Sequence, residues 1–421
     1  MKGNHQRRNY IINLNVKQSQ NRFAWSSFIQ IIPINQLYTP RPSTMTSIPP
    51  TSTQLIFKAF NEPLVLEKSS PPKSAPAGSA LVQTLATVIR PHYREHFAGR
   101  GFLNVPAPSL PGHACIGRVL AVGPDAVALR PGQLVFAHGF AFARDDPVNT
   151  QVLYGLHRGN SMGTERAGVL FDYWKGFWQD VNSVPLENCV ALDEKRLVDD
   201  LHYGFDDLMY LDRLSVAYGP ISAAKLIPAE IVVVAPATGH YSGAVAELAA
   251  QLGCRVIALT RNASKMTPLT SRHSNITAVE LTGDRETDLA AIRTLLPPTK
   301  TGADAFIDVS PPQATGNSHH FDIGLEVLRP GARAVLSGAL STATLPYSSI
   351  LFRNINIIGK WMFTAQEMDA LARMVEAGVI KLGKQAGHEN VGGGFKFEEW
   401  EKGLLEAEGA VEWGRHVMFM P

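Results

Sequence analysis

The stretch Val234-Ala-Pro-Ala-Thr-Gly-His-Tyr-Ser-Gly243 decides how this chain folds. An apolar run, Ile231–Ala235, leads into a turn around Gly239, and small residues then open a helical pattern over residues 244–252. A strand, a tight turn and a helix in this order present backbone N–H groups and the positive end of a helix dipole to an anion. Such a turn binds the pyrophosphate of a dinucleotide, and we expect it to do so here through Ala237, Thr238, Gly239, His240, Tyr241 and Ser242.

The next expected strand indicates which dinucleotide is bound. It covers Arg255–Thr260 and is followed by Arg261 and Asn262, with Lys265 one turn later and no carboxylate among them. A unit that binds NAD normally has Asp or Glu here for the ribose hydroxyls. A guanidinium instead pairs with the 2′-phosphate of NADPH, which a carboxylate would repel. We therefore expect NADP(H), bound in part by Arg261 and Lys265; a solvated arginine at a strand end is the alternative.

Composition restricts the class of protein. The chain has 421 residues, of which 45% are hydrophobic and 18% charged, and this suits a globular protein of two domains. Its three cysteines are far apart in the sequence and odd in number, which favours a reducing compartment without a disulfide framework. No apolar stretch approaches the roughly 20 residues that cross a bilayer, so we expect no membrane partner.

The charged residues are unevenly distributed. Residues 1–44 hold six Lys or Arg and no acidic residue, which leaves 33 basic and 37 acidic residues in the remainder. A slightly acidic body offers no basic surface to nucleic acid, and we exclude that class of partner. The basic segment is typical of a mitochondrial presequence, whereas a chain that starts at Met45 would be cytoplasmic. We favour the cytoplasmic alternative and expect residues 1–52 to be a disordered extension.

Two patterns divide the remaining residues. Short strand patterns and turns fill residues 53–192, for example the apolar runs at 80–89 and 116–123. From Ile231 onward, strands alternate with helices, which predicts an α/β fold with a doubly wound parallel sheet. A capping box, Thr364 to Glu367, is expected to open a later helix. The expected strands of the parallel sheet span residues 231–235, 255–260, 278–281, 305–309, 332–337 and 355–358.

Seven motifs in a fixed order resemble those of the medium-chain dehydrogenase/reductase superfamily. They are Pro111-Gly-His-Ala-Cys-Ile-Gly-Arg-Val119, Val122-Gly-Pro-Asp-Ala-Val127, Pro131-Gly-Gln-Leu-Val135, Val184-Pro-Leu-Glu-Asn188, the turn at 237–242, Leu328-Arg-Pro-Gly331 and Gly414-Arg-His-Val-Met418. The resemblance implies a GroES-like β domain at 53–215, a Rossmann domain that binds NADP at 216–363, and a return to the first domain at 364–421. It also implies a homodimer through the strand near residues 332–358.

The resemblance is weakest where zinc-dependent members bind their metal. Those members have Glu after the Gly-His of the first motif, and this chain has Ala114. Their first Cys ligand aligns near His92, and a later one near Ser215 or Val216. His92 and His113 make two ligands, whereas a catalytic zinc ion needs three from the protein. We therefore expect no metal, as in the quinone oxidoreductase-like branch that includes fungal alcohol dehydrogenase-like proteins.

If no zinc ion is present, the resemblance implies that a side chain or a water molecule stabilises and protonates the oxyanion that hydride transfer creates. We expect Tyr218, in the helix that links the domains, together with His92 and Tyr93, to be catalytic. His96 and Tyr173 are further candidates near the cleft. Some of these residues have a structural alternative: Tyr218 suits a core position, and the two histidines suit a solvated loop.

Two other features belong near the expected cleft. Gly338 follows a predicted strand and aligns with the place where the backbone passes the nicotinamide, so we assign it to the cofactor site. Trp174, Phe177 and Trp178 form an aromatic cluster, which suits either an apolar substrate pocket or the packing of the β domain.

The sequence therefore predicts an NADPH-dependent oxidoreductase that reduces a small apolar carbonyl, or oxidises the corresponding alcohol, without a metal. Reduction of the C=C bond of a quinone or enone is an alternative on the same fold, because fold does not determine the reaction. A non-catalytic, NADPH-binding regulatory protein is another alternative. The weakened glycine pattern of the turn, with Pro236, Gly239 and Ser242 at its three positions, motivates it.

Overall fold

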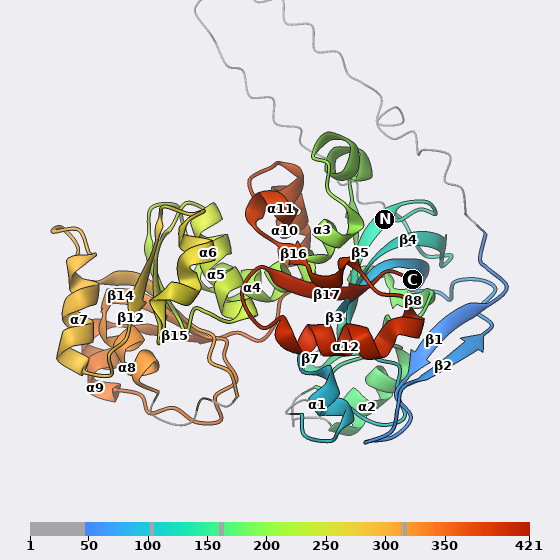
Figure 1. Ribbon diagram of the computed structural model, residues 1–421, viewed down its shortest axis with the longest axis horizontal. Coiled ribbons are helices and arrows are strands. Elements are labelled where there is room, and N and C mark those ends of the chain that lie inside the picture. Colours follow the sequence, from blue (N-terminus) through green and yellow to red (C-terminus); the bar gives the residue numbers. More distant parts are fainter. Residues whose placement is uncertain (1–46, 102–104, 160–163, 313, 315–317) are drawn as a thin grey trace, which may run out of the picture. The chain divides into compact units, whose positions relative to one another are not determined.

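The computed structural model describes residues 47–421 except 102–104, 160–163, 313 and 315–317, and a mostly antiparallel sheet forms its first part (Figure 1). The strands of this sheet are β3 (Ser79–Ile89), β4 (Ala114–Val122), β5 (Leu134–His138), β8 (Val181–Pro185), β9 (Cys189–Leu192), β16 (Glu389–Asn390) and β17 (Arg415–Phe419). Their order is β16-β17-β3-β4-β5-β9, and β8 also pairs with β3. Met418 of β17 lies opposite Val88 of β3, so the end of the chain returns to the first domain, as the resemblance implied.

A parallel six-stranded sheet forms the second part, and it confirms the doubly wound fold. Its strands are β10 (Ile231–Ala235), β11 (Arg255–Thr260), β12 (Ile276–Glu280), β13 (Ala303–Asp308), β14 (Leu328–Leu336) and β15 (Asn356–Gly359). The order is β12-β11-β10-β13-β14-β15. The strands β11 and β12 therefore lie on one side of β10, and β13 to β15 lie on the other. Every residue of β10 is buried, because helices cover both faces of such a sheet.

Helices connect these strands and link the two sheets. They are α1 (Tyr93–Phe97), α2 (Thr164–Tyr173), α3 (Phe205–Met209), α4 (Leu211–Ala224), α5 (His240–Gln251), α6 (Thr267–Thr270), α7 (Arg285–Thr294), α8 (His319–Glu326), α9 (Tyr347–Arg353), α10 (Ala365–Glu376), α11 (Gly383–Ala386) and α12 (Trp400–Gly409). The predicted capping box opens α10: the backbone N–H of Glu367 donates to Thr364 Oγ1 at 3.2 Å, and that of Thr364 donates to Glu367 Oε2 at 2.6 Å. Helix α4 packs against α5 and α10, which connects the first domain to the parallel sheet.

Some elements differ from the expectations. A hairpin of β6 (Phe140–Ala143) and β7 (Asp146–Leu153) lies within the region expected to hold short strands, but its position was not predicted, and the same is true of the pair of β1 (Ser52–Ile56) with β2 (Val65–Ser69). Strand β1 begins at Ser52, the last residue of the expected N-terminal extension, while residues 1–46 lie outside the described part. Short helical turns complete the chain at η2 (Leu186–Asn188), η3 (Lys195–Asp200), η4 (Ala263–Met266), η5 (Val391–Gly393) and η6 (Phe397–Glu399).

The structure also describes the three cysteines and the length of each helix. Cys115, Cys189 and Cys254 are all free thiols. Within the described ranges, no helix has both the length and the apolar character that crossing a membrane requires.

Candidate active site

A cleft of about 1210 Å³ lies at the carboxyl ends of the parallel strands, which is where ligands bind in sheets of this class. One wall consists of residues that follow these strands, such as Pro236 after β10 and Val309 after β13. The opposite wall comes from other parts of the chain, namely Arg90, His92, His96, Leu156 and Val216. Residues of both the Rossmann part and the first domain therefore line the cleft.

The predicted phosphate-binding turn forms the middle of the cleft. Thr238, Gly239, His240, Tyr241 and Ser242 all line it, whereas Ala237 is buried and its N–H donates to Leu259 O at 3.0 Å. The backbone N–H of Gly239 donates to Ser242 Oγ at 3.0 Å, which fixes the turn at the start of α5. Because the first N–H groups of a helix have no partners within it, this end of α5 suits an anion.

One of those N–H groups is already used by the C-terminal return. The N–H of His240 donates to Val411 O at 3.0 Å, and Gly239 forms a bridge with Glu412. Val411 also lines the cleft. The segment before β17 therefore borders the phosphate turn, a contact that the local sequence pattern did not indicate.

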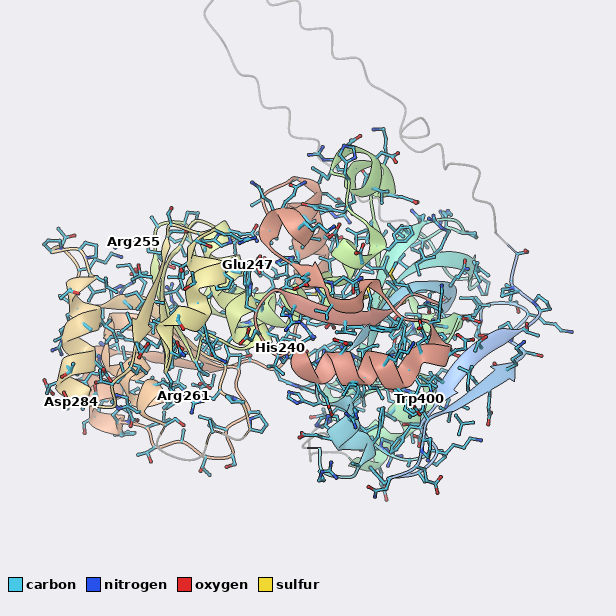
Figure 2. All side chains as sticks on the ribbon, viewed as in Figure 1. His240, Glu247, Arg255, Arg261, Asp284 and Trp400 are labelled. Atoms are coloured by element: carbon cyan, nitrogen blue, oxygen red, sulfur yellow. The ribbon has the colours of Figure 1, made fainter. Side chains whose placement is uncertain are left out.

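The ribose corner of the cleft, defined here by Arg261, Asn262 and Lys265, follows β11. Figure 2 shows Arg261 and Arg255 at opposite ends of this strand. Asn262 caps the turn, since its Oδ1 accepts from the N–H of Ser264 at 3.0 Å. Arg261 and Lys265 are exposed. The structure thus brings both predicted cationic residues to one corner of the cleft.

Residues after β13 and β14 form another part of the wall. Gly338 lines the cleft, and a Cβ atom there would lie 2.5 Å from Asp308 Oδ2 and 2.6 Å from the backbone nitrogen of Ser310. Only glycine fits between these groups without a shift. Ser310 Oγ lies 2.5 Å from Asp308 Oδ1 and 2.7 Å from His320 Nε2, which makes a short chain of polar groups at the cleft. Ser310 and His320 were not predicted as site residues.

Asp308 and His320, the ionisable members of this series of polar groups, have shifted pKa values. Burial raises the pKa of Asp308 to about 6, although hydrogen bonds from Ser310 oppose the shift. Burial lowers the pKa of His320 to about 4, and the nearby positive charge of Arg261 adds to it. At neutral pH the imidazole of His320 is therefore uncharged and the carboxyl of Asp308 is mostly ionised.

A mostly buried group, which we call the arginine cluster, consists of Arg90, His113, Asp212, Arg213 and Tyr241, and it borders the cleft through Arg90 and Tyr241. The Nε atom of Arg90 lies 2.6 Å from His113 Nε2, and Asp212 Oδ1 lies 2.8 Å from the same nitrogen. Arg213 Nη1 donates to the Tyr241 hydroxyl at 3.0 Å and approaches Asp212 Oδ2 at 3.3 Å. The guanidinium carbons of both arginines lie 5.1 Å from the centre of the Tyr241 ring, so two cations flank one aromatic side chain.

Burial and charge set the ionisation of the cluster. Burial lowers the pKa of His113 to about 4, with a further contribution from Arg90, so the ring is neutral at pH 7. Burial alone would raise the pKa of Asp212, but His113 and the two arginines hold it well below its usual range. Asp212 is therefore a carboxylate between two guanidinium groups at neutral pH.

The predicted catalytic residues do not all meet at the cleft. His92 and His96 line it, and the His92 ring lies 6.2 Å from that of His240. Among the described residues, Tyr93, Tyr173 and Tyr218 do not line it. Tyr93 is buried, with its hydroxyl 3.3 Å from His113 Nδ1. Tyr218 is half-buried on α4 and packs against the main hydrophobic core, so its catalytic role remains a prediction that geometry does not favour.

The aromatic cluster before β8 has a structural role. Trp174, Phe177 and Trp178 are buried in the cores of the first domain, and none of them is among the described residues that line the cleft. Trp178 also donates from Nε1 to Val88 O at 3.1 Å. Packing of the β domain therefore explains these three side chains.

The side chains that contact His113 Nε2 differ from the positions that the resemblance aligned with zinc ligands. The resemblance aligned two ligands near His92 and near Ser215 or Val216, whereas the residues that contact His113 Nε2 are Arg90 and Asp212. Asp212 lies three residues, about one helical turn, before Ser215, and residues one turn apart share a face of α4. Asp212 thus lies one turn from the aligned position on the same helix.

The arginine cluster does not fit a zinc ion. A dication at His113 Nε2 would stand where the Arg90 guanidinium now contacts that nitrogen. In the described ranges, no three side chains of His, Cys, Asp or Glu converge as metal ligands. The chemistry of this donor set, one arginine with one imidazole and one carboxylate, is that of a hydrogen-bonded ion pair.

Comparison with known proteins places these features in context. Residues 76–194 match the alcohol dehydrogenase GroES-like domain family. An L-threonine 3-dehydrogenase of Anaeromyxobacter dehalogenans (strain 2CP-C) is 24% identical over 260 residues, which cover 61% of this chain and 67% of that protein.

Solved structures share the whole architecture. A thermostable alcohol dehydrogenase from Pyrobaculum aerophilum is 20% identical, with a TM-score of 0.63 over 88% of this chain and 100% of its own. A protein of Sinorhizobium meliloti 1021, named as a zinc-binding dehydrogenase and solved with bound NADP, is 17% identical, with a TM-score of 0.65 over 88% of this chain and 99% of its own. The fold is therefore that of these dehydrogenase structures.

Proposed function

We propose that this chain is an NADPH-dependent oxidoreductase of the medium-chain dehydrogenase type, which reduces a carbonyl group or oxidises the corresponding alcohol. The observation that carries this proposal is the continuity of the cleft. One cavity contains the ribose corner, the phosphate turn and Arg90 of the arginine cluster. A dinucleotide bound along this cavity would extend from the ribose corner, past the phosphate turn, toward Arg90.

The charge of the ribose corner supports NADPH over NADH. Within the described ranges, Arg261 makes no ion pair with a protein carboxylate. Glu280 is the acidic residue that contacts this turn, and its Oε2 accepts from the N–H of Ala263 at 2.7 Å. Lys265 pairs with Glu412 at 3.2 Å, but both side chains are half exposed. A 2′-phosphate would therefore meet a free guanidinium and a lysine that can rotate toward it.

The arginine cluster supports a reaction without a metal. When bound, NADPH supplies the hydride. The first turn of α5 would hold the pyrophosphate, and Gly338, which lines the same cleft, would present its backbone to the nicotinamide. Leu156 and Val216 add apolar side chains to the cleft that Arg90 also lines, and such side chains would limit the access of water to the reacting carbonyl.

The experiment that tests the proposal is a titration of the full-length chain with NADPH and with NADH. Arg261→Ala should weaken NADPH binding by about 1.5–3 kcal/mol, or roughly 10- to 150-fold, as expected for a hydrogen bond to a charged group. NADH binding should stay the same. Arg255→Ala is the matched control, because it removes an exposed arginine from the other end of β11. An equal loss for both cofactors would contradict the assignment of Arg261 to the 2′-phosphate.

Oxidation of NADPH with a panel of substrates separates the reactions. Aldehydes and ketones as the better substrates would support carbonyl reduction, and quinones or enones would support the C=C alternative. Metal analysis of the same active sample should find less than stoichiometric zinc. Tight NADPH binding with no turnover across the panel would favour the non-catalytic regulatory protein.

We also propose that the chain forms a homodimer through the edge of its parallel sheet. Strand β15 is an edge strand of that sheet, and an edge exposes unpaired N–H and C=O groups. Two large apolar side chains of the preceding α9, Tyr347 and Phe352, are strongly exposed, and Trp361 just after β15 is partly so. Sedimentation velocity should give a dimer for the natural chain and a monomer for Phe352→Glu.

A further inference from the structure

Arg90 occupies an unusual position for a charged residue. It lines the cleft, although its side chain is only 12% exposed. Its Nε atom contacts His113, and its Nη2 lies 3.4 Å from Asp212 Oδ1. Within the described part of the chain, Nη1 makes no hydrogen bond. The guanidinium is therefore held on one edge while the other edge remains available to a ligand in the cleft.

The cluster carries more positive than negative charge. Behind Arg90, the Arg213 side chain is only 1% exposed, and its Nε and Nη2 atoms are buried without a hydrogen-bond partner among the described residues. Two guanidinium groups thus share a single carboxylate, that of Asp212, because His113 is neutral. A buried excess of one positive charge is costly unless an anionic group compensates it. A ligand that brings a negative oxygen to Arg90 would supply this compensation.

We propose that Arg90 is a catalytic residue whose guanidinium binds the substrate oxygen that becomes negative as the hydride is transferred. His113 and Asp212 are positioning residues that fix the guanidinium. This inference rests on the proposed function and deepens it, since it assigns the electrophile of the reaction to a side chain. Fixed donors directed at a developing oxyanion are among the largest contributions to catalysis.

The substrate step balances without any further reagent. The carbonyl carbon accepts the hydride, the π electron pair of the C=O bond moves to the oxygen, and that oxygen then takes a proton from water. In total, R₂C=O, NADPH and H⁺ give R₂CHOH and NADP⁺. Arg90 stays protonated throughout, because its pKa lies far above neutral pH. It acts by stabilising charge and not by donating the proton.

The lining of the cleft indicates the class of substrate. Leu156 and Val216 line the same cleft as Arg90, so we expect the group attached to the carbonyl to be apolar. The same site should bind a carboxylate attached to an apolar ring, because carboxylate oxygens carry the charge that the carbonyl oxygen acquires only in the transition state. Benzoate is such a probe.

The first test measures the binding of benzoate to the complex of the full-length protein with NADP⁺ by calorimetry. The natural protein should bind it, and Arg90→Ala should lose at least tenfold in affinity. Arg144→Ala is the control, because Arg144 pairs with Glu187 in the same domain and does not line the cleft. No binding of benzoate to the natural complex, or equal binding by Arg90→Ala, would overturn the proposal. This readout does not depend on turnover.

The second test uses the carbonyl compound that the natural protein reduces fastest. Arg90→Ala should lower kcat by about 10²- to 10³-fold, the range seen when an oxyanion donor is removed. The deuterium isotope effect with labelled NADPH should rise, because hydride transfer becomes slower than product release. Added guanidinium ion should restore part of the activity of Arg90→Ala in a saturable manner and should not change that of Arg144→Ala.

Affinity for NADPH separates this inference from the proposed function. Arg90→Ala should bind NADPH as tightly as the natural protein does. A parallel loss of NADPH affinity would overturn the proposal and assign Arg90 to the cofactor's pyrophosphate. If the natural protein bound neither NADPH nor NADH, the proposed function itself would fail. If it bound NADPH and reduced carbonyls equally fast without Arg90, only the present inference would fail.

Discussion

Asp212 Oδ1 lies 2.8 Å from His113 Nε2, and the side chains of both residues are almost fully buried, at 4% and 2% exposed. The same carboxylate neutralises two cations, since it lies 3.4 Å from Arg90 and 3.3 Å from Arg213. Asp212→Asn should therefore lower the free energy of unfolding by about 3–5 kcal/mol, the usual cost of removing one partner of a buried pair. Urea denaturation at pH 7 measures this change.

A second substitution tests whether charge is the cause. Arg213→Met removes one of the two buried cations and keeps much of the side-chain volume. In the Asp212→Asn background it should restore part of the lost stability, because the amide then faces one guanidinium and not two. Losses that simply add up in the double variant would show that the charges are not coupled.

The ion pair of Lys265 with Glu412 competes with the cofactor for the lysine. Its Nζ lies 3.2 Å from Glu412 Oε1, and both side chains are about half exposed. Exposed pairs are worth at most about 1 kcal/mol, so Glu412→Gln should strengthen NADPH binding by no more than about fivefold. NADH binding should not change. Titrations at low and high salt check the result, because the gain should shrink as salt screens the charges.

Gly338 should not tolerate a side chain. A Cβ atom there would stand 2.5 Å from Asp308 Oδ2 and 2.6 Å from the Ser310 backbone nitrogen. Gly338→Ala should cost about 1–3 kcal/mol of stability and weaken NADPH binding, because the backbone must shift at the cleft. Gly359→Ala is the control, since a Cβ atom at this end of β15 would meet nothing within 4 Å. Thermal melts with and without NADPH compare the two variants.

The strands of the parallel sheet could be predicted closely from the sequence, because these strands are buried. The strands β10 and β11 were predicted to the residue, because a strand covered on both faces is an unbroken apolar run with clear ends. The β6–β7 hairpin was missed, since its outer strand mixes polar and apolar residues. An irregular mixture of polar and apolar residues is weaker evidence for a strand than a continuous apolar run.

The arginine cluster could not be assembled from the sequence. Arg90 and His113 are 23 residues apart, and Arg90 and Asp212 are 122 apart, so no local spacing connects them. One signal was available: Asp212 and Arg213 are adjacent charges at the start of a helix, α4, whose other buried residues are mostly apolar or small. Charged residues in a helix that is otherwise buried indicate a paired or functional site. That signal identifies the residues but not their partners.

Buried histidines should make the protein sensitive to acid. Burial lowers the pKa of His138 and His416 to about 3 and that of His96 to about 4. An unfolded histidine has a pKa near 6.5, so between pH 6.5 and about 4 the unfolded chain binds protons that the folded chain does not. The free energy of unfolding should therefore be greatest above pH 6.5 and fall steadily as the pH decreases.

His138 offers the sharpest test of this pH dependence. Its ring packs edge-on against Phe363, with ring centres 5.0 Å apart, and His138→Phe keeps an aromatic ring there. Asn188 would still donate to the backbone oxygens of residues 138 and 140, at 2.7 and 2.8 Å. Between pH 6 and 4.5, the slope of unfolding free energy against pH should decrease by about 1.4 kcal/mol per pH unit, the value for one proton. Parallel slopes for the two proteins in urea denaturation would mean that His138 takes up its proton equally in both states, and the acid sensitivity would then belong to other groups.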